Sequence, residues 1–282
     1  MNPTEHAPMP TTDPTDHART PHRVHLPGCR TPGELRFAYL NLADHPRGVL
    51  MLQRLVAAGF VPTLVIDEES ALADSGRSSQ RAELDRVPGY EPPPLTEDLC
   101  AAHGIPRYTV PHHNDKKVAH LIQEADVHIA VLGDTRILKP FVIDSAPHGI
   151  VNVHPGFLPD VRGNNPYIWS VIHDLPQGAT AHFIDPGVDR GPILLARRIE
   201  LPDGTDLPQL VHTLNELCAD IVVEALHHLA SGAATATPQP DDPRLTFREA
   251  RPEVRALAAK MLRERAERAE RSERAERHVI RP

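Results

Sequence analysis

From residue 34 onward, short apolar runs alternate with longer amphipathic segments. In these longer segments, for example 45–60, apolar residues recur every three or four positions, which is the period of an amphipathic helix. A strand, a helix and a second strand at this spacing require a parallel crossover connection. The pattern therefore predicts an α/β fold with a mostly parallel sheet. The predicted strands are 35–42, 61–68, 105–110, 127–133 and 149–156.

The second half of the chain predicts a further group of elements. A helix at 165–174 is followed by strands at 178–185 and 192–201, which we expect to be antiparallel, and by a long amphipathic helix at 207–232. Residues 69–96 carry Ser, Gly, Arg and a run of prolines, and this composition predicts a surface segment without regular structure.

Both ends differ in composition from the middle of the chain. Residues 1–33 are dominated by Pro, Thr and His, and they bury too little apolar surface to offset their ordering entropy, so we expect a disordered arm. Residues 238–282 end in an Arg/Glu-rich run, which predicts a C-terminal helical extension supported by its own ion pairs. A narrow apolar stripe predicts that this extension is docked up to residue 262. The folded domain would then span 34–237.

Charge and cysteine content narrow the classes of function. The 282 residues carry 30 Lys and Arg against 38 Asp and Glu, a net charge of −8, which gives no electrostatic reason to bind nucleic acid or an anionic membrane. Three cysteines far apart do not make a disulfide framework, and they fit a reducing cytoplasm. The sequence also lacks the apolar run of a membrane span and the pattern of a signal peptide.

Candidate chemistry gathers at the end of the strand predicted near 149–156. Asn152 and His154 are two positions apart, so their side chains lie on one face of that strand. Ligands of open α/β sheets bind at the carboxyl ends of the strands. An amide can donate to a developing oxyanion and an imidazole can move a proton, so the pair suits a reaction at a carbonyl carbon. A carboxylate is the best third group to orient the imidazole.

Two linked motifs extend this pattern. The chain reads NVHPGFLPDVRGNNPYIW over 152–169 and GATAHFIDPGVDRGPIL over 178–194. These stretches resemble the 10-formyltetrahydrofolate-dependent formyltransferases, whose pattern is N-x-H-P-x-x-L-P-x-x-x-G followed further along by a strand and D-x-G-P/D-I. The resemblance covers 95–230 well and 35–68 loosely. It implies a Rossmann-like formyltransferase catalytic domain over 34–237.

The resemblance also implies roles for individual residues. Asn152, His154 and Asp189 would be catalytic, with 10-formyltetrahydrofolate as the formyl donor and no metal. Asn152 and a protonated His154 can hold the formyl oxygen, while Asp189 keeps His154 charged or relays a proton from the attacking amine. His182, on the strand that leads to Asp189, would support this set. The backbone that corresponds to the family's pterin pocket is that of Leu132, Gly133, Asp134, Asp185, Pro186, Gly187 and Val188.

The acceptor side departs from the family pattern. NLADHPRG stands where many relatives have a Gly-containing turn, so we expect Asn41, Asp44 and His45 to face the cleft entrance. Arg162 either pairs with a phosphate or carboxylate of the acceptor or locks its own loop. The run RGNNPYIWSVI resembles members that act on amino groups of nucleotide-linked sugars or natural-product precursors. We therefore expect a small-molecule acceptor with a primary amine, or an N-hydroxy or hydrazine-type nitrogen, in sugar or secondary-metabolite biosynthesis.

Other interpretations stay open. The formyltetrahydrofolate hydrolase of this family carries an extra N-terminal regulatory domain, which residues 1–33 do not supply. The methionyl-tRNA member has a basic C-terminal β-barrel, whereas residues 238–282 form an Arg/Glu run of balanced charge. A transferase that uses a carbamoyl or another one-carbon donor, and a folate-binding protein without catalysis, are further alternatives. The sequence leaves a homodimer open.

Overall fold

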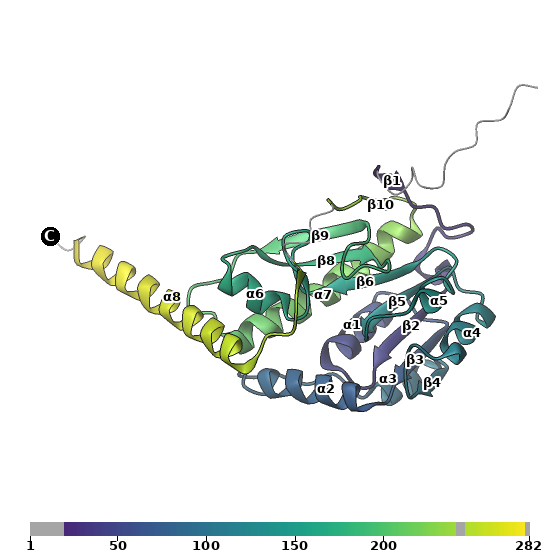
Figure 1. The fold of residues 1–282 in the computed structure, drawn as a ribbon, viewed down its shortest axis with the longest axis horizontal. Helices are drawn as coiled ribbons and strands as arrows, with labels where there is room; N and C mark the ends of the chain where they lie inside the picture. Colours follow the sequence, from purple (N-terminus) through teal and green to yellow (C-terminus); the bar gives the residue numbers. More distant parts are fainter. Residues whose placement is uncertain (1–19, 241–245, 280–282) are drawn as a thin grey trace, which may run out of the picture.

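A computed structural model describes residues 20–240 and 246–279, and its centre is a seven-stranded sheet (Figure 1). The strands of this sheet are β2 (Phe37–Leu42), β3 (Leu64–Glu68), β4 (Arg107–Val110), β5 (Ile129–Asp134), β6 (Ile150–His154), β8 (Gln177–Phe183) and β9 (Ile193–Ile199). Their order is β4-β3-β2-β5-β6-β8-β9. The first five run parallel, and β8 pairs antiparallel with both β6 and β9. The predicted α/β fold with a mostly parallel sheet is confirmed.

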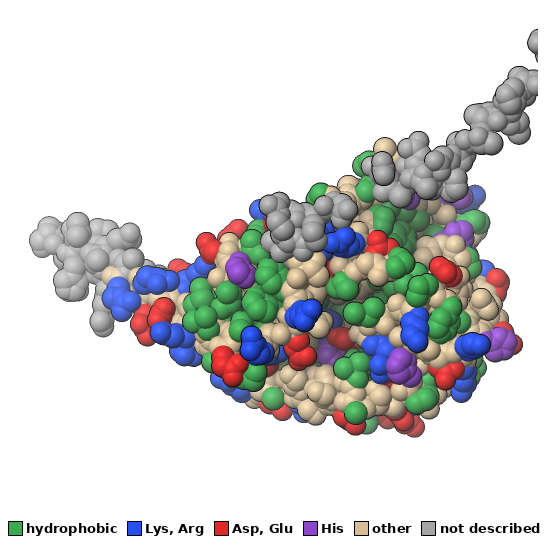
Figure 2. Space-filling view, viewed as in Figure 1, with side chains coloured by type: hydrophobic (Ala, Val, Ile, Leu, Met, Phe, Trp, Pro, Cys, Tyr) green, Lys and Arg blue, Asp and Glu red, His purple; other side chains and the backbone are tan. Residues whose placement is uncertain are grey.

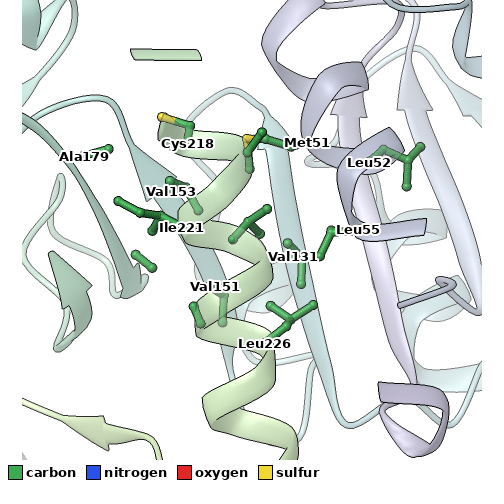
Figure 3. Close-up of a cluster of buried hydrophobic side chains, with 14 of the residues drawn as sticks. Met51, Leu52, Leu55, Val131, Val151, Val153, Ala179, Cys218, Ile221 and Leu226 are labelled. Carbon is green, nitrogen blue, oxygen red and sulfur yellow. The ribbon is translucent and has the colours of Figure 1, made fainter. Parts of the chain in front are cut away.

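Two helices cover one face of the sheet. Figure 3 shows side chains of α1 (Pro46–Ala57) and α7 (Leu207–Ala230) over Val131, Val151 and Val153 of β5 and β6. These three valines are at most 1% exposed, and burying such a side chain contributes about 1.5–3 kcal/mol each. Because successive side chains of a strand point to opposite faces, the alternate residues form a second core. This packing explains the near-continuous apolar runs of the parallel strands.

The opposite face is covered by α4 (Lys116–Glu124) and α5 (Pro140–Ile143). Ala130 and Leu132 of β5 point to this side, together with Val118 of α4. The two helix layers fix the sheet from both sides, as in other doubly wound folds.

The carboxyl edge of the sheet contains the point where the strand order reverses. β2 pairs with β3 on one side and with β5 on the other, so successive crossovers leave in opposite directions there. The ladder between β5 and β6 joins Ala130 to Ile150 and Val131 to Val151, although β6 continues to His154. The last residues of both strands therefore lie beyond their mutual ladder, at the edge where such folds bind ligands.

The segment 69–96 is more regular than its composition predicts. It contains α2 (Ala71–Leu84), whose N-cap Ser70 accepts a hydrogen bond from the backbone N–H of Ala73 at 3.3 Å. Among the residues of α2, only Ala73 and Leu84 are buried, so apolar periodicity gives little sign of this helix. The next helix is α3 (Thr96–His103).

The beginning of the described chain is packed on the domain. β1 (His22–Arg23) pairs antiparallel with β10 (Thr235–Ala236), and Leu26 is 1% exposed. The prediction of a disordered arm is therefore wrong for residues 20–33, because a pairing with so distant a segment leaves no local pattern. The short 3-10 helix η2 (Pro32–Glu34) then leads into β2. Residues 1–19 lie outside the described residues.

The chain after α7 returns to the sheet and then forms the last helix. β11 (Thr246–Phe247) pairs in parallel with β7 (Arg162–Gly163), which lies in the loop after β6. The antiparallel pair β8 and β9 is the one expected from the sequence.

The last helix, α8 (Pro252–Val279), packs on α6 (Pro166–Ile172) and then extends away from the domain (Figure 1). Ala258 and Leu262 are 0% and 3% exposed, which matches the expected docking up to residue 262. In the described part of the chain, no helix has the length and apolarity to cross a membrane.

Candidate active site

The carboxyl end of β6 brings together the polar residues that the sequence singled out. Asn152 lies opposite His182 of β8, and His154 lies opposite Thr180. His154 is 4% exposed and His182 is fully buried. The antiparallel β8, which ends the parallel part of the sheet, thus supplies a second imidazole beside the first pair. Asp189 reaches the same place from the loop between β8 and β9.

The ring of His154 is held in one orientation. Its Nε2 donates to the backbone oxygen of Val161 at 3.1 Å, because a carbonyl can only accept. Its Nδ1 therefore faces the carboxylate of Asp189, 3.5 Å from Oδ2. Gly156 is required beside the ring, since a Cβ at this position would lie 2.6 Å from His154 Nε2. The neutral ring thus keeps its lone pair on Nδ1, directed at Asp189.

Asp189 is a half-buried carboxylate with several polar neighbours. Its Oδ2 accepts a hydrogen bond from the backbone N–H of Gly163 at 2.8 Å, and its Oδ1 lies 3.6 Å from His182 Nε2. Burial alone would raise the pKa of this carboxyl, but His154, His182 and the N–H of Gly163 outweigh it and hold the pKa well below its ordinary value. Asp189 is therefore ionised throughout the neutral range.

Burial lowers the pKa of His154 from its ordinary value of 6.5, and the charge of Asp189 opposes that shift only in part. The resting imidazole at neutral pH is therefore uncharged. It carries its proton on Nε2 and can accept another on Nδ1, where Asp189 would stabilise the imidazolium.

A second imidazole fixes the amide of Asn152. His182 Nδ1 donates to the backbone oxygen of Phe183 at 2.8 Å, so in the neutral ring Nε2 is the acceptor. Asn152 Nδ2 lies 3.1 Å from that nitrogen and donates to it. This bond sets which end of the Asn152 amide is the NH2 group.

The two backbone segments expected to hold a donor lie at the end of β5 and directly after β8, the strands on the two sides of β6. Residues 132–134 end β5 beyond its ladder with β6, and residues 185–188 begin the loop that carries Asp189. The Asp185 carboxylate accepts from the N–H of Gly187 at 2.9 Å and so shapes this loop into a tight turn. Asp134 also takes a role that the sequence did not reveal, because its Oδ2 accepts from Arg47 Nη2 at 2.5 Å.

The loop after β5 is fixed by a buried carboxylate of β3. Glu68 is fully buried and accepts hydrogen bonds from the guanidinium of Arg136, from Ser70 Oγ and from the backbone N–H of His113. Burial alone would raise the pKa of Glu68, but these bonds outweigh it and lower the pKa to about 2. The three donors come from the loops after β5, β3 and β4, so the Glu68 carboxylate holds three loops of the carboxyl edge together.

Three residues expected at the acceptor side are buried within the protein. Asn41 is fully buried, and a Cβ on Gly48 would lie 1.9 Å from its side-chain oxygen, so Asn41 does not face the cleft entrance. His45 is also buried, 3.4 Å from Asp134. Arg162 is 1% exposed and donates to the side-chain oxygen of Gln239 at 3.1 Å. Of the two roles considered for Arg162, the structure favours the locking of its loop.

Asp44 keeps a partly exposed side chain, and its Oδ1 accepts from the N–H of Thr96 at 2.8 Å. Sequence reasoning missed Gln239, Arg47 and Glu68. Glu68 and Arg47 lie within a predicted strand and a predicted helix as ordinary charged residues, and Gln239 lies in a Pro-rich run without periodicity. Their partners are distant in sequence, so no local signal identifies them.

The fold of this chain is similar to those of solved formyltransferases. A phosphoribosylglycinamide formyltransferase from Anaplasma phagocytophilum has the same fold, with a TM-score of 0.57 at 17% identity over 76% of this chain and 98% of that one. A sugar N-formyltransferase from Shewanella sp. gives a TM-score of 0.54 at 16% identity, over 76% of each chain.

The formyl transferase family model matches residues 64–226, more than half of the chain, and this protein belongs to that family. The methionyl-tRNA formyltransferase of Pelobacter propionicus is 35% identical over 152 residues, which are 53% of this chain and 47% of that one. The chain thus spans about half the length of the curated relatives it matches.

Proposed function

We propose that this protein transfers a formyl group from 10-formyltetrahydrofolate to an amine nitrogen of an acceptor. The observation that carries this proposal is the set of Asn152, His154 and Asp189, in which the imidazole is buried and its two partners are half-buried, in a chain of the formyl transferase family. A pre-oriented amide, an uncharged imidazole and an ionised carboxylate are the groups that acyl transfer to an amine needs.

The residues present fit the donor. A pterin ring offers several hydrogen-bond donors and acceptors in one plane, and backbone groups at a strand end match such a pattern. The backbone of 132–134 lies outside the ladder between β5 and β6, and the turn at 185–188 follows β8, the strand on the other side of β6. These two segments would hold the pterin of the donor, which supplies the formyl group on its N10 atom. Glu68 and Arg136 would support the first segment by fixing the loop after it.

The proton path follows from the tautomer of His154. As the acceptor amine forms its bond to the formyl carbon, the Asp189 carboxylate, which lies 3.5 Å from His154 Nδ1, passes the amine proton to that nitrogen and then stabilises the resulting imidazolium. The Asn152 NH2 group has a second N–H besides the one directed at His182, and this N–H donates to the formyl oxygen as that oxygen gains negative charge. His154 then returns the proton to the nitrogen of the departing tetrahydrofolate. One C–N bond forms and one breaks, so water is not consumed.

We infer a small-molecule acceptor, an amino sugar or a natural-product precursor with a primary amine or an N-hydroxy or hydrazine-type nitrogen. The run RGNNPYIWSVI, which forms β7 and α6 beside the site, supports this acceptor class. The net charge of −8 does not favour a polyanionic acceptor. On the face seen in Figure 2, basic and acidic side chains are interspersed and form no single basic surface.

A second candidate acceptor is methionyl-tRNA. The 35% identity to a protein named methionyl-tRNA formyltransferase favours it. Because tRNA binding depends on Lys and Arg contacts to phosphates, this candidate would require salt-sensitive activity.

The decisive experiment follows the release of tetrahydrofolate from 10-formyltetrahydrofolate by absorbance, with the full chain and a panel of amino sugars, hydroxylated ornithine and hydrazine-type amines. We expect release that depends on one class of amine and is absent in His154→Ala. Release without any amine would instead identify a hydrolase. Folate binding without release, by any amine or by methionyl-tRNA, would identify a binding protein. Labelled formyl on methionyl-tRNA would support the second candidate.

A further inference from the structure

We propose that Gln239, on the segment after α7, is a positioning residue of the formyl-transfer site. The inference rests on the proposed function, because it assigns to Gln239 the placement of Asp189. Gln239 lies outside residues 64–226, which the family model matches.

The side-chain amide of Gln239 connects two loops of the site. Its Oε1 accepts from Arg162 Nη2 at 3.1 Å and from Arg162 Nε at 3.3 Å. Its Nε2 donates to the backbone oxygens of Asp189 at 3.0 Å and Gly191 at 2.7 Å. Both ends of one half-buried amide are thus used, and each end holds a different loop.

The fold places Gln239 there through a short backbone pairing. Thr237 and Ile193 exchange both backbone hydrogen bonds, each 2.8 Å long, in an antiparallel bridge. In an antiparallel pair, the residue two positions after Thr237 lies near the residue two positions before Ile193. That geometry sets Gln239 beside Gly191, at the end of the Asp189 loop.

The position of the Asp189 carboxylate depends on both loops. Asp189 has a φ of +51°, a conformation that a non-glycine residue keeps only when its surroundings fix it. Its carboxylate is bonded to the N–H of Gly163, the residue that follows Arg162 in β7. Gln239 therefore holds the backbone of Asp189 and, through Arg162, the strand that carries the hydrogen-bond donor to its carboxylate. Without this amide, the two loops can separate and Asp189 can move away from His154 Nδ1.

The test compares Gln239→Met with the native chain, since Met has a similar length and none of the hydrogen bonds. We expect kcat to fall about 10- to 100-fold, the effect of a small misplacement of a catalytic group, with the KM for 10-formyltetrahydrofolate within about twofold of native. The pH dependence of kcat gives the more specific readout. Because the charge of Asp189 opposes the lowering of the His154 pKa, a displaced Asp189 should move the acidic limb to lower pH.

Gln177→Met is the matched control. Gln177 is a buried glutamine that, like Gln239, donates to a backbone oxygen, that of Tyr167 at 3.0 Å, and it is not bonded to the Asp189 loop. We expect this variant to keep the native kcat and the native acidic limb of the pH dependence of kcat, even if its melting temperature falls. Gln239→Glu is the second test variant, because it retains acceptors for Arg162 and loses both bonds to the Asp189 loop. It should lose activity as Gln239→Met does, and it decides the question if the Met variant does not fold.

The proposal would be overturned if the Gln239 variants kept native kcat and a native acidic limb in the pH dependence of kcat. It would also be overturned if their changes equalled those of Gln177→Met. A native chain that transfers no formyl group would instead overturn the proposed function, so the two failures are distinguishable.

Discussion

At the scale of single residues, the site is defined by which atoms already have partners. His154 Nε2 is engaged by Val161, Asn152 Nδ2 is directed at His182, and Asp189 Oδ2 receives the N–H of Gly163. Each side chain is thereby held in one orientation before any ligand binds, which is the pre-organisation that electrostatic catalysis requires. The atom left to move a proton is His154 Nδ1.

Loss of either end of the His154–Asp189 pair should remove activity. We expect His154→Ala and Asp189→Asn each to lower kcat by more than about 100-fold, the usual effect of a positioned acid–base group. Asp174→Asn is the matched control, because Asp174 also has a positive φ and an ion pair, with Arg265, but lies outside the cluster. Steady-state rates with the responsive amine measure the effect. Half of the native rate in either site variant would contradict the assignment.

The pH dependence of kcat should report an uncharged His154. Its pKa lies below the ordinary 6.5, so more than half of the imidazole is neutral at pH 6.5. If the neutral ring accepts the amine proton, kcat should fall to half of its plateau value only on the acidic side of pH 6.5. Rates from pH 5 to 9 in buffers of constant ionic strength test this. An activity that declines as pH rises through 7 would show that the imidazolium is the working form.

At the scale of elements, the site depends on a two-residue strand. β7 contributes the Gly163 N–H to Asp189 and pairs with β11 from the end of the chain. Gly163 has a φ of +89°, and a Cβ there would lie 2.0 Å from the backbone oxygen of Phe247. Only glycine allows this close approach, which explains the last glycine of the N-x-H-P-x-x-L-P-x-x-x-G motif.

Gly163→Ala should therefore destabilise the protein more than an ordinary glycine substitution. Gly204→Ala is the matched control, since Gly204 has a φ of +87° and no heavy atom within 4 Å of an added Cβ. In the control, the free energy of unfolding should fall only by the cost of a positive φ at alanine, about 1–2 kcal/mol. Gly163→Ala adds a steric clash with β11, so it should destabilise the protein further and also lower kcat. Melting temperatures and rates of the two variants measure the difference. Equal melting temperatures with native activity in both would contradict the role given to this contact.

The elements also show what the sequence can reveal. Asn152 and His154 were found because a strand end is visible from apolar periodicity, and Asp189 because its motif resembles a family. The burial of Asn41 was missed, since its two glycine neighbours, Gly48 and Gly133, come from different elements. The role of Gln239 was missed because its four hydrogen bonds reach residues far along the chain. Local pattern predicts elements, whereas these contacts depend on how distant elements meet.

At the scale of the whole molecule, a segment near the beginning of the described chain and the segment after α7 meet near β9. Residues 22–23 pair with 235–236, and Thr237 pairs with Ile193 at the start of β9. The same C-terminal segment then supplies Gln239, β11 and the docked part of α8. The segments that complete the domain around its sheet therefore lie before and after residues 64–226, the region that the family model matches.

Two truncations should separate the docked part of α8 from the rest of that helix. A chain ending at residue 265 keeps Ala258, Leu262 and the ion pair of Arg265 with Asp174, so its melting temperature, activity and oligomeric state should be native. A chain ending at residue 240 exposes the apolar surface under α8 and removes β11, which pairs beside Gly163. It should therefore melt at lower temperature, lose activity and tend to associate, because apolar surface that packed against α8 meets water. Size-exclusion chromatography, melting curves and rates of both chains test this. A chain ending at 265 that changes its oligomeric state would show that the Arg/Glu-rich end of α8 is an interaction element and not only a helix supported by its own ion pairs.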